Sequence, residues 1–484
     1  RQGVLRVTFH QHRAVIRSLG CKVNQCDAEA TASELRAAGC VILDDSDATS
    51  LDESPADLCI VYTCSVTAEG DRKSRQMIRH LIREHPNALM VVAGCYAEVR
   101  PDDLRTIDGV DMVVGTSDAA QLLPQIYAAL DIMEPDGEKS CSEDSCRRTR
   151  AFVKIQDGCD QFCSYCQIPL TRGTPHSRDT GTILKEVRGF VEHGHLEVVL
   201  CGIRLGAFGM DRGDPNALAE LLRQLDTIEG LVRYRLSSIE PNDFGEPLLK
   251  ALPELKKLAP HFHIPLQSGS DTVLQRMNRR YTAQDYQSLI KRLQSLIPNL
   301  AVSTDVLVGF PGETEEEARE TEVFVEKMLF SKVHLFPFSP RPGTVAADLK
   351  PRISAADVRC RKRRLEGVTL AGAIQFRKRF VGSTLQVLIE GKELVASETG
   401  KMFRTGFSEN YLRVAIPTSC EQPLRAGEVY DTVIERLDRN MLLKTQTSED
   451  VLSSSEERFE KVGTAQESTG AGLLIGNVPI ASNR

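Results

Sequence analysis

Short apolar runs alternate with amphipathic stretches along the first quarter of the chain. Runs rich in β-branched residues, separated by stretches of helical periodicity, are typical of parallel strands with covering helices. The pattern therefore predicts a doubly wound parallel α/β sheet over residues 13–128. The expected strands are AVIRSLG, CVILDD, DLCIVYT, ALMVVAG and DMVVG, and the helices between them include NQCDAEATASELRAAG and TAEGDRKSRQMIRHLIREH.

A second α/β series follows a polar stretch without apolar periodicity, which predicts a linker at residues 129–148. Each pair of runs is separated by enough residues for a crossover helix, and six such units favour an open, partial (βα)6 barrel over the closed form of eight. We assign residues 149–380 to it. The runs are AFVKIQ, LEVVLCGI, VRYRLSSI, HFHIPLQ, LAVSTDVLVGF and KVHLFPF.

The pattern changes after residue 380 to short strands with no helical periodicity between them. A small β-barrel is predicted over residues 381–446, from STLQVLIEG, ELVASE, YLRVAIP and EVYDTVIERLD. Residues 447–484 are rich in Ser, Glu and Gly, and we expect them to be disordered.

Composition then narrows the class. The 484 residues are 41% hydrophobic, enough for two to four domains. No apolar run reaches the roughly 18 residues of a membrane span, and the first 20 residues lack the apolar core of a signal peptide, so we expect a cytoplasmic protein without a membrane partner. In a reducing compartment, 14 cysteines are core residues, metal ligands or nucleophiles rather than disulfides.

Three of these cysteines lie close together after the first strand of the second series. Cys159, Cys163 and Cys166, in DGCDQFCSYCQIP, have the spacing C-x3-C-x2-C. Structural zinc sites usually have four ligands, often from two separated pairs, so one tight loop with three thiolates fits zinc poorly. It fits a cluster of four irons in which one iron stays open to a small molecule. The alternatives are zinc completed by a remote ligand such as His176, and chance clustering.

Three further cysteines each follow a predicted strand of the first domain: Cys21, Cys64 and Cys95. The carboxyl ends of strands in a doubly wound sheet converge on one crevice. Glycine precedes two of the three, as a close backbone approach requires. A lone cysteine at a strand end is more often a small buried hydrophobe, so the geometry by itself leaves a shared metal site and core packing open.

The residues around both sets resemble known motifs. DGCDQFCSYCQIP resembles the signature of the radical S-adenosylmethionine enzymes, in which the open iron of a [4Fe-4S] cluster chelates S-adenosylmethionine and reductive cleavage gives a 5′-deoxyadenosyl radical. SLGCKVNQCDAE, YTCSVT and AGCYAE resemble the motifs of the methylthiotransferases within that superfamily. This resemblance, which runs from about residue 13 to 446, implies a second [4Fe-4S] cluster on Cys21, Cys64 and Cys95, with one iron free for sulfur.

Other segments carry the same resemblance: HIPLQSGSDTVLQRMNRRY, TDVLVGFPGETEEE and LFPFSPRPGT. From the position of these motifs at strand ends we expect Gln267, Ser268, Asp305 and Gly309 to contact S-adenosylmethionine, although turn and cap chemistry would place the same residues there.

The last small barrel resembles the TRAM domain, an RNA-binding module; the alternative is that it is a structural cap. From Asp357 to Phe380, eight Lys/Arg oppose two Asp/Glu, so this segment is either a phosphate-binding surface or a solvated helix face.

The resemblance implies a reaction and its partners. It is closest to the branch that adds a methylthio group to C2 of N6-threonylcarbamoyladenosine beside the tRNA anticodon, with flavodoxin or ferredoxin as electron donor. Cys26 stands where that branch has an aromatic residue; we interpret it as structural, the alternative being a fourth ligand. The other candidate substrates are N6-isopentenyladenosine in tRNA and a ribosomal-protein aspartate. A non-catalytic iron-sulfur RNA-binding protein is the alternative from another class.

The remaining cysteines are given no chemistry. Cys40, Cys59 and Cys201 lie in or beside apolar runs and are expected in the core. Cys141 and Cys146 lie in the polar linker. Cys360 and Cys420 have no predicted function.

Overall fold

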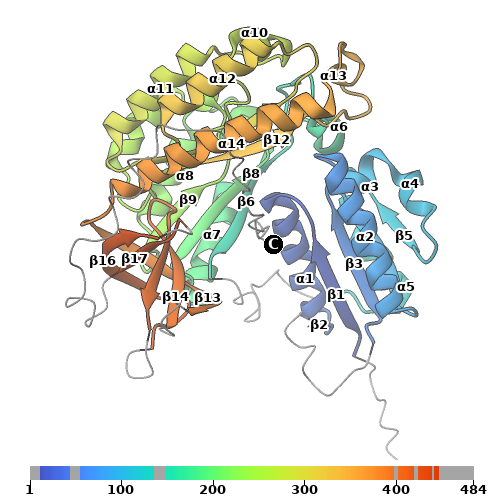
Figure 1. Cartoon of the computed structure of the whole chain (residues 1–484). Coiled ribbons are helices and arrows are strands. Elements are labelled where there is room, and N and C mark those ends of the chain that lie inside the picture. The colour runs from blue at the N-terminus through green and yellow to red at the C-terminus, as the bar shows by residue number, and fades with distance from the viewer. Residues whose placement is uncertain are drawn as a thin grey trace, which may run out of the picture. The chain divides into compact units, whose positions relative to one another are not determined.

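A computed structural model of the chain describes most of its length (Figure 1). All the described residues belong to one compact unit, Arg1–Thr445. Most of the predicted linker, together with Cys141, Cys146, Cys420 and the tail at 447–484, lies outside them. Within these residues, no helix is long and apolar enough to cross a membrane. The described ranges are 11–43, 55–135, 149–396, 402–418, 423–438 and 441–445.

The first domain is the predicted doubly wound sheet, with five parallel strands in the order β2-β1-β3-β4-β5. This order reverses direction between β1 and β3, which is where such sheets form their binding crevice. The strands are β1 (Arg13–Ser18), β2 (Val41–Leu43), β3 (Leu58–Thr63), β4 (Leu89–Gly94) and β5 (Met112–Val114). The helices are α1 (Lys22–Ala37), α2 (Ala68–Glu84), α3 (Cys95–Val99), α4 (Pro101–Arg105) and α5 (Leu122–Leu130).

Strand β3 shows why the sequence reads as a continuous apolar run. All six of its residues are buried. Leu58, Ile60 and Tyr62 pack in one cluster with residues of α1 and α5, while Cys59 and Val61 pack in another with residues of α2 and α4. A parallel strand covered on both faces has no polar side to alternate with.

The central domain is an open barrel of six parallel strands, as predicted, with one added antiparallel strand of two residues at its edge. Its two sheets, β7-β6-β8-β9 and β10-β11-β12, are linked by parallel bridges from Tyr234 to Leu258 and from Ser238 to His263. The strands are β6 (Ala151–Asp157), β7 (His176–Ser177), β8 (Glu197–Gly202), β9 (Arg233–Leu236), β10 (His261–His263), β11 (Ala301–Val308) and β12 (Lys332–Pro337).

Helices cover the outer face of this barrel; Figure 1 shows α11, α12 and α14 along one side of it. Alternate strand residues, such as Val302, Val306 and Val308 of β11, join the core beneath these helices, so the residues between them face the lumen. The helices are α6 (Ile168–Arg172), α7 (Thr180–Glu192), α8 (Ala217–Asp226), α9 (Glu246–Ala251), α10 (Asp271–Arg276), α11 (Ala283–Leu296), α12 (Glu315–Met328), α13 (Val345–Asp348) and α14 (Ala355–Lys378).

The last domain is a closed five-stranded barrel, which confirms the predicted architecture but not the predicted strand list. The runs STLQVLIEG and ELVASE form one long strand with an irregularity in its pairing, and two strands, β14 and β17, were not predicted. MFRTGFS lacks a β-branched run and LKT is only three residues long, so neither gives a pattern. The strands are β13 (Thr384–Ala396), β14 (Met402–Ser408), β15 (Arg413–Pro417), β16 (Val429–Leu437) and β17 (Leu443–Thr445).

Candidate functional site: two cysteine triads at strand ends

The first triad lies on the loop between β6 and α6. Hydrogen bonds hold this loop at both ends: the Cys159 amide donates to the Gly173 carbonyl (3.0 Å), and the Ser164 amide donates to the Met277 carbonyl (3.0 Å). The Cys166 amide donates to the Cys163 carbonyl (3.0 Å), which closes a tight turn. The three thiols are thereby held on one short, fixed piece of backbone.

The surroundings of Cys159 and Cys166 favour the protonated form of both thiols. Burial, with Cys163 nearby, raises the pKa of the Cys159 thiol to about 11, and burial with both neighbours raises the pKa of Cys166 to about 12. Arg279 donates a hydrogen bond to the Cys163 sulfur (3.2 Å) and is itself paired with Glu240. Because a thiol must lose its proton to bind metal, a metal bound by Cys159 and Cys166 would have to offset the cost of deprotonating them.

The second triad gathers at the switch point of the first sheet. Cys21 precedes α1, Cys64 follows β3, and Cys95 opens α3. Gly20, at φ +95°, lies so close to Cys64 that a Cβ on it would approach the Cys64 Cβ to 2.6 Å. Burial, with the neighbouring Cys21 and Cys95, raises the pKa of the Cys64 thiol to about 12. The glycine before Cys21 is therefore required by contact between two strand ends.

The spacing of the sulfurs tests zinc against a larger cluster. Four ligands around one zinc lie about 3.8 Å apart, from Zn–S bonds of about 2.3 Å. Among the residues that the structure describes, only His263, Asp305 and His334 bring three ligand atoms within 4.8 Å of one another. Neither cysteine triad does, although the members of each are neighbours. Thiolates spread more widely than one ion needs fit separate irons of a cluster.

Two of the predicted cofactor contacts lie together: Gln267, in the segment after β10, and Asp305, within β11. Gln267 has left-handed backbone (φ +68°), and its amide donates to the Asp305 carbonyl (2.8 Å). The Asp305 carboxylate pairs with His263 (3.1 Å). Ser268 is buried, with its hydroxyl bonded to Thr321 (3.1 Å). Its contact with the cofactor, like that of Gln267 and Asp305, stays a prediction.

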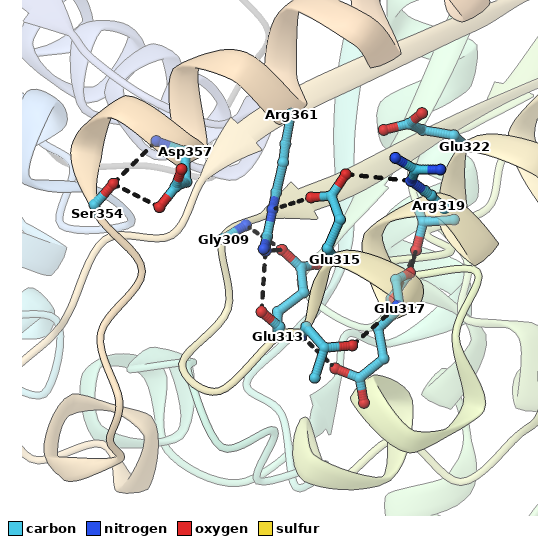
Figure 2. Close-up of polar contacts among 12 residues, drawn as sticks. Gly309, Glu313, Glu315, Glu317, Arg319, Glu322, Ser354, Asp357 and Arg361 are labelled. Carbon is cyan, nitrogen blue, oxygen red and sulfur yellow. Dashed lines mark hydrogen bonds and ion pairs between the residues drawn. The ribbon is translucent and has the colours of Figure 1, made fainter.

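Gly309, the fourth predicted contact, lies at a turn that is fixed by charge (Figure 2). Its amide donates to the Glu313 carboxylate (3.0 Å), and Arg361 of α14 donates to the same carboxylate (2.7 Å). At φ +77°, a Cβ on Gly309 would approach Val358 to 2.5 Å, so the turn needs glycine to pass beneath α14. The next helix, α12, begins with a capping box formed by Thr314 and Glu317.

Two family models match the chain: the Radical SAM superfamily over residues 153–325 and the Uncharacterized protein family UPF0004 over residues 13–115. The curated relative "Threonylcarbamoyladenosine tRNA methylthiotransferase MtaB" of Bacillus subtilis is 38% identical over 420 residues, covering 84% of this chain and 89% of that protein. The chain belongs to the radical S-adenosylmethionine methylthiotransferase family.

This methylthiotransferase is also similar to a second curated relative and to a solved structure. It is 35% identical to "tRNA-2-methylthio-N(6)-dimethylallyladenosine synthase" of Acidothermus cellulolyticus, over 80% of this chain and 79% of that protein. Its fold is similar to that of the radical S-adenosylmethionine methyltransferase TsrM of Kitasatospora setae, with a TM-score of 0.52 at 15% identity over 70% of this chain and 77% of that chain. The family implies a [4Fe-4S] cluster and S-adenosylmethionine, and the β6–α6 loop offers the thiols for that cluster.

Sequence reasoning missed the residues that link the second triad of this methylthiotransferase to the barrel. Arg172, buried at the end of α6, donates to the Cys95 sulfur (3.4 Å). It also pairs with Asp27 of α1 (3.0 Å) and with Asp157 of β6 (2.9 Å). A single side chain from the barrel thus sets a positive charge beside the second triad. Nothing in the sequence distinguishes this arginine from the other arginines of the chain.

Arg341, in the motif LFPFSPRPGT, forms the other link. Its guanidinium donates to Asp71 (2.6 Å), to Ser65 (2.9 Å) and to Gln167 (3.2 Å). Ser65 directly follows Cys64, and Gln167 directly follows Cys166. The residues beside one cysteine of each triad therefore share one buried arginine.

Arg341→Met is expected to lower the free energy of unfolding by about 3–5 kcal/mol, because it leaves the buried Asp71 carboxylate without its partner. Urea unfolding followed by circular dichroism measures the change. The matched control is Arg319→Met: Arg319 is 72% exposed beside Glu315, and its loss should cost about 0.5 kcal/mol or less. Adding Asp71→Asn to Arg341→Met should restore part of the loss; equal losses for the two single arginine variants would contradict a buried link.

Of the other described cysteines, all but Cys360 are buried in apolar packing. Cys26 packs against Cys201, Val23 and Val199 where α1 meets the barrel, which agrees with the structural interpretation. Cys40 and Cys59 are buried in the core of the first domain, and Cys360 is exposed on α14.

Proposed function

We propose that the chain is a tRNA methylthiotransferase that adds a methylthio group to C2 of N6-threonylcarbamoyladenosine beside the anticodon. One observation carries the proposal: one cysteine triad lies at the strand ends of the first domain and another on the β6–α6 loop, and Arg341 binds the residues that follow Cys64 and Cys166. The relatives named as MtaB support the substrate, at 35–38% identity over at least 82% of this chain.

Each triad has its own part in the reaction. Cys159, Cys163 and Cys166 would hold the [4Fe-4S] cluster at which S-adenosylmethionine binds, and Cys21, Cys64 and Cys95 would hold a second [4Fe-4S] cluster. When bound, these groups supply the radical that removes the C2 hydrogen and the sulfur that replaces it, with electrons from flavodoxin or ferredoxin. The chain supplies position and charge: Arg279 and Arg172 each donate to one cysteine sulfur, and Gln267, Ser268, Asp305 and Gly309 line the turns where the cofactor would lie.

Fewer cations of the basic segment 357–380 are available to bind RNA than its composition predicts. Arg361 is buried against Glu313, and Arg364 pairs with Glu315 (2.9 Å) and Glu322 (2.8 Å). Those charges are compensated within the protein and are not available for phosphate. Arg359, Arg363 and Lys378 remain exposed on α14, and with the TRAM-like barrel they are our candidates for contact with tRNA.

Mass spectrometry of tRNA nucleosides tests the substrate. A strain lacking the gene should lose 2-methylthio-N6-threonylcarbamoyladenosine and accumulate its unmethylthiolated precursor, while the chain returned on a plasmid restores it. Loss of the methylthio form of N6-isopentenyladenosine instead would move the protein to the other tRNA branch. Loss of neither nucleoside, with a missing methylthio group on a ribosomal-protein aspartate, would overturn the tRNA assignment.

A further inference from the structure

The lumen of the central barrel carries charged side chains that the two triads do not use. On β12, Val333 and Leu335 pack toward the helices, so Lys332 and His334 face the lumen. Parallel pairing places His334 beside Asp305 of β11 and Lys332 beside Ser303. Helix α1 of the first domain packs on β6 and β8 and closes part of the same lumen.

Most cations of this lumen are compensated. Arg233 and Arg235 of β9 both pair with Glu197, Arg235 at 2.6 Å, and also donate to carbonyls of the last domain. Lys154 of β6 pairs with Asp27 and with Asp157 (3.2 Å). In each case the protein supplies the anion.

Two lysines differ from these. Lys332 and Lys22, the latter directly after Cys21, form no ion pair with any residue in the described ranges, and both are exposed. Both lie near His334: burial first, and then Lys332, lowers the pKa of the His334 imidazole to about 4, while Asp305 opposes the shift and Lys22 adds a smaller lowering. Two lysine charges thus meet a single carboxylate here, that of Asp305, which lies beside His334 and is already paired with His263.

A metal ion is the competing occupant, because His263, Asp305 and His334 place their ligand atoms within 4.8 Å of one another. Two lysines beside this group oppose a cation. Asp305 is moreover paired already with His263 (3.1 Å). The surplus positive charge favours an anion at the Lys332 side of the lumen.

We propose that Lys332, with Lys22 and His334, binds the carboxylate at the end of the threonylcarbamoyl group and so selects this base over adenines with an apolar N6 substituent. The inference rests on the proposed function and adds the residues that recognise the N6 substituent of the substrate base. A threonyl group ends in a carboxylate, whereas a dimethylallyl group carries no charge. A site that offers charged donors favours a ligand that can pair with them over one that cannot.

Synthetic anticodon stem-loops test the proposal directly. One carries N6-threonylcarbamoyladenosine and the other its carboxamide, which has the same shape but no charge. The reconstituted wild-type enzyme should have a kcat/KM for the acid about 10- to 100-fold above that for the amide, the range expected of a charge-assisted hydrogen bond. Lys332→Met should lose most of this ratio by slowing only the acid, and Lys332→Arg should keep much of it.

Two controls separate the outcomes. Lys291→Met changes an exposed lysine on α11 and should leave the ratio as in the wild type. For Lys22→Met, both the iron content and the ratio of kcat/KM for the acid to that for the amide are measured. A lower ratio with full iron content indicates loss of carboxylate binding, whereas a lower iron content indicates damage to the neighbouring Cys21 site. If the wild type modifies the acid and Lys332→Met keeps the full ratio, the carboxylate site is wrong and the proposed function stands. If the wild type modifies neither stem-loop, the proposed function fails and the inference fails with it.

Discussion

Replacing Cys159, Cys163 and Cys166 together by alanine should abolish reductive cleavage of S-adenosylmethionine and remove about half of the iron. Two clusters of four irons give about eight irons per wild-type chain after anaerobic reconstitution, and the variant should retain about four. Cys159, Cys163 and Cys166 are all the cysteines of the β6–α6 loop, so the variant loses every thiol of that loop. Release of 5′-deoxyadenosine and methionine under reduction, measured by chromatography, gives the readout.

The control for this variant is Cys360→Ala, which removes an exposed thiol on α14 and should change neither iron content nor cleavage. A triple variant that still released 5′-deoxyadenosine would contradict the assignment of the loop. A wild-type protein that held iron but released none under reduction would instead favour the non-catalytic iron-sulfur RNA-binding protein.

Replacing Cys21, Cys64 and Cys95 by alanine should have the complementary effect. Cleavage of S-adenosylmethionine continues, because the β6–α6 loop keeps its own thiols and Arg279, but transfer of the methylthio group stops. About four irons remain. Anaerobic assays that follow 5′-deoxyadenosine and the methylthiolated nucleoside in one reaction measure both effects.

The thermal unfolding of this second variant needs its own check, because Cys64 and Cys95 are buried and their loss leaves small cavities. Cys59→Ala, a buried cysteine of β3 outside the triad, is the matched control: it should cost similar stability and leave transfer intact. Full iron content in the triple variant would show that these cysteines hold no cluster.

The sequence predicted the strands correctly where the pattern of apolar residues was clear. Strands β3 and β4 are apolar because both faces are covered, so the runs that encode them are unambiguous. It failed for β14 and β17, one polar and one three residues long, because pairing within a closed barrel decides such strands and the local pattern does not.

The candidate site divides in the same way. The spacing of Cys159, Cys163 and Cys166 defines a ligand loop by itself, because the three thiols share one short piece of chain. The convergence of Cys21, Cys64 and Cys95 followed from the rule that parallel strand ends meet. The Arg341 links to Ser65 and Asp71 cross more than 200 residues of sequence and follow from no local rule.

Local spacing and periodicity by themselves predicted one candidate ligand loop, that of Cys159, Cys163 and Cys166, and the kind of fold on which it lies. Only the tertiary structure decided where charge is compensated. Arg361, in the most basic segment of the chain, is neutralised by Glu313, whereas Lys332, in an ordinary strand, meets no carboxylate among the described residues. The reason is physical: a charge acts through distances of a few ångströms in space, and the folding of the chain sets those distances.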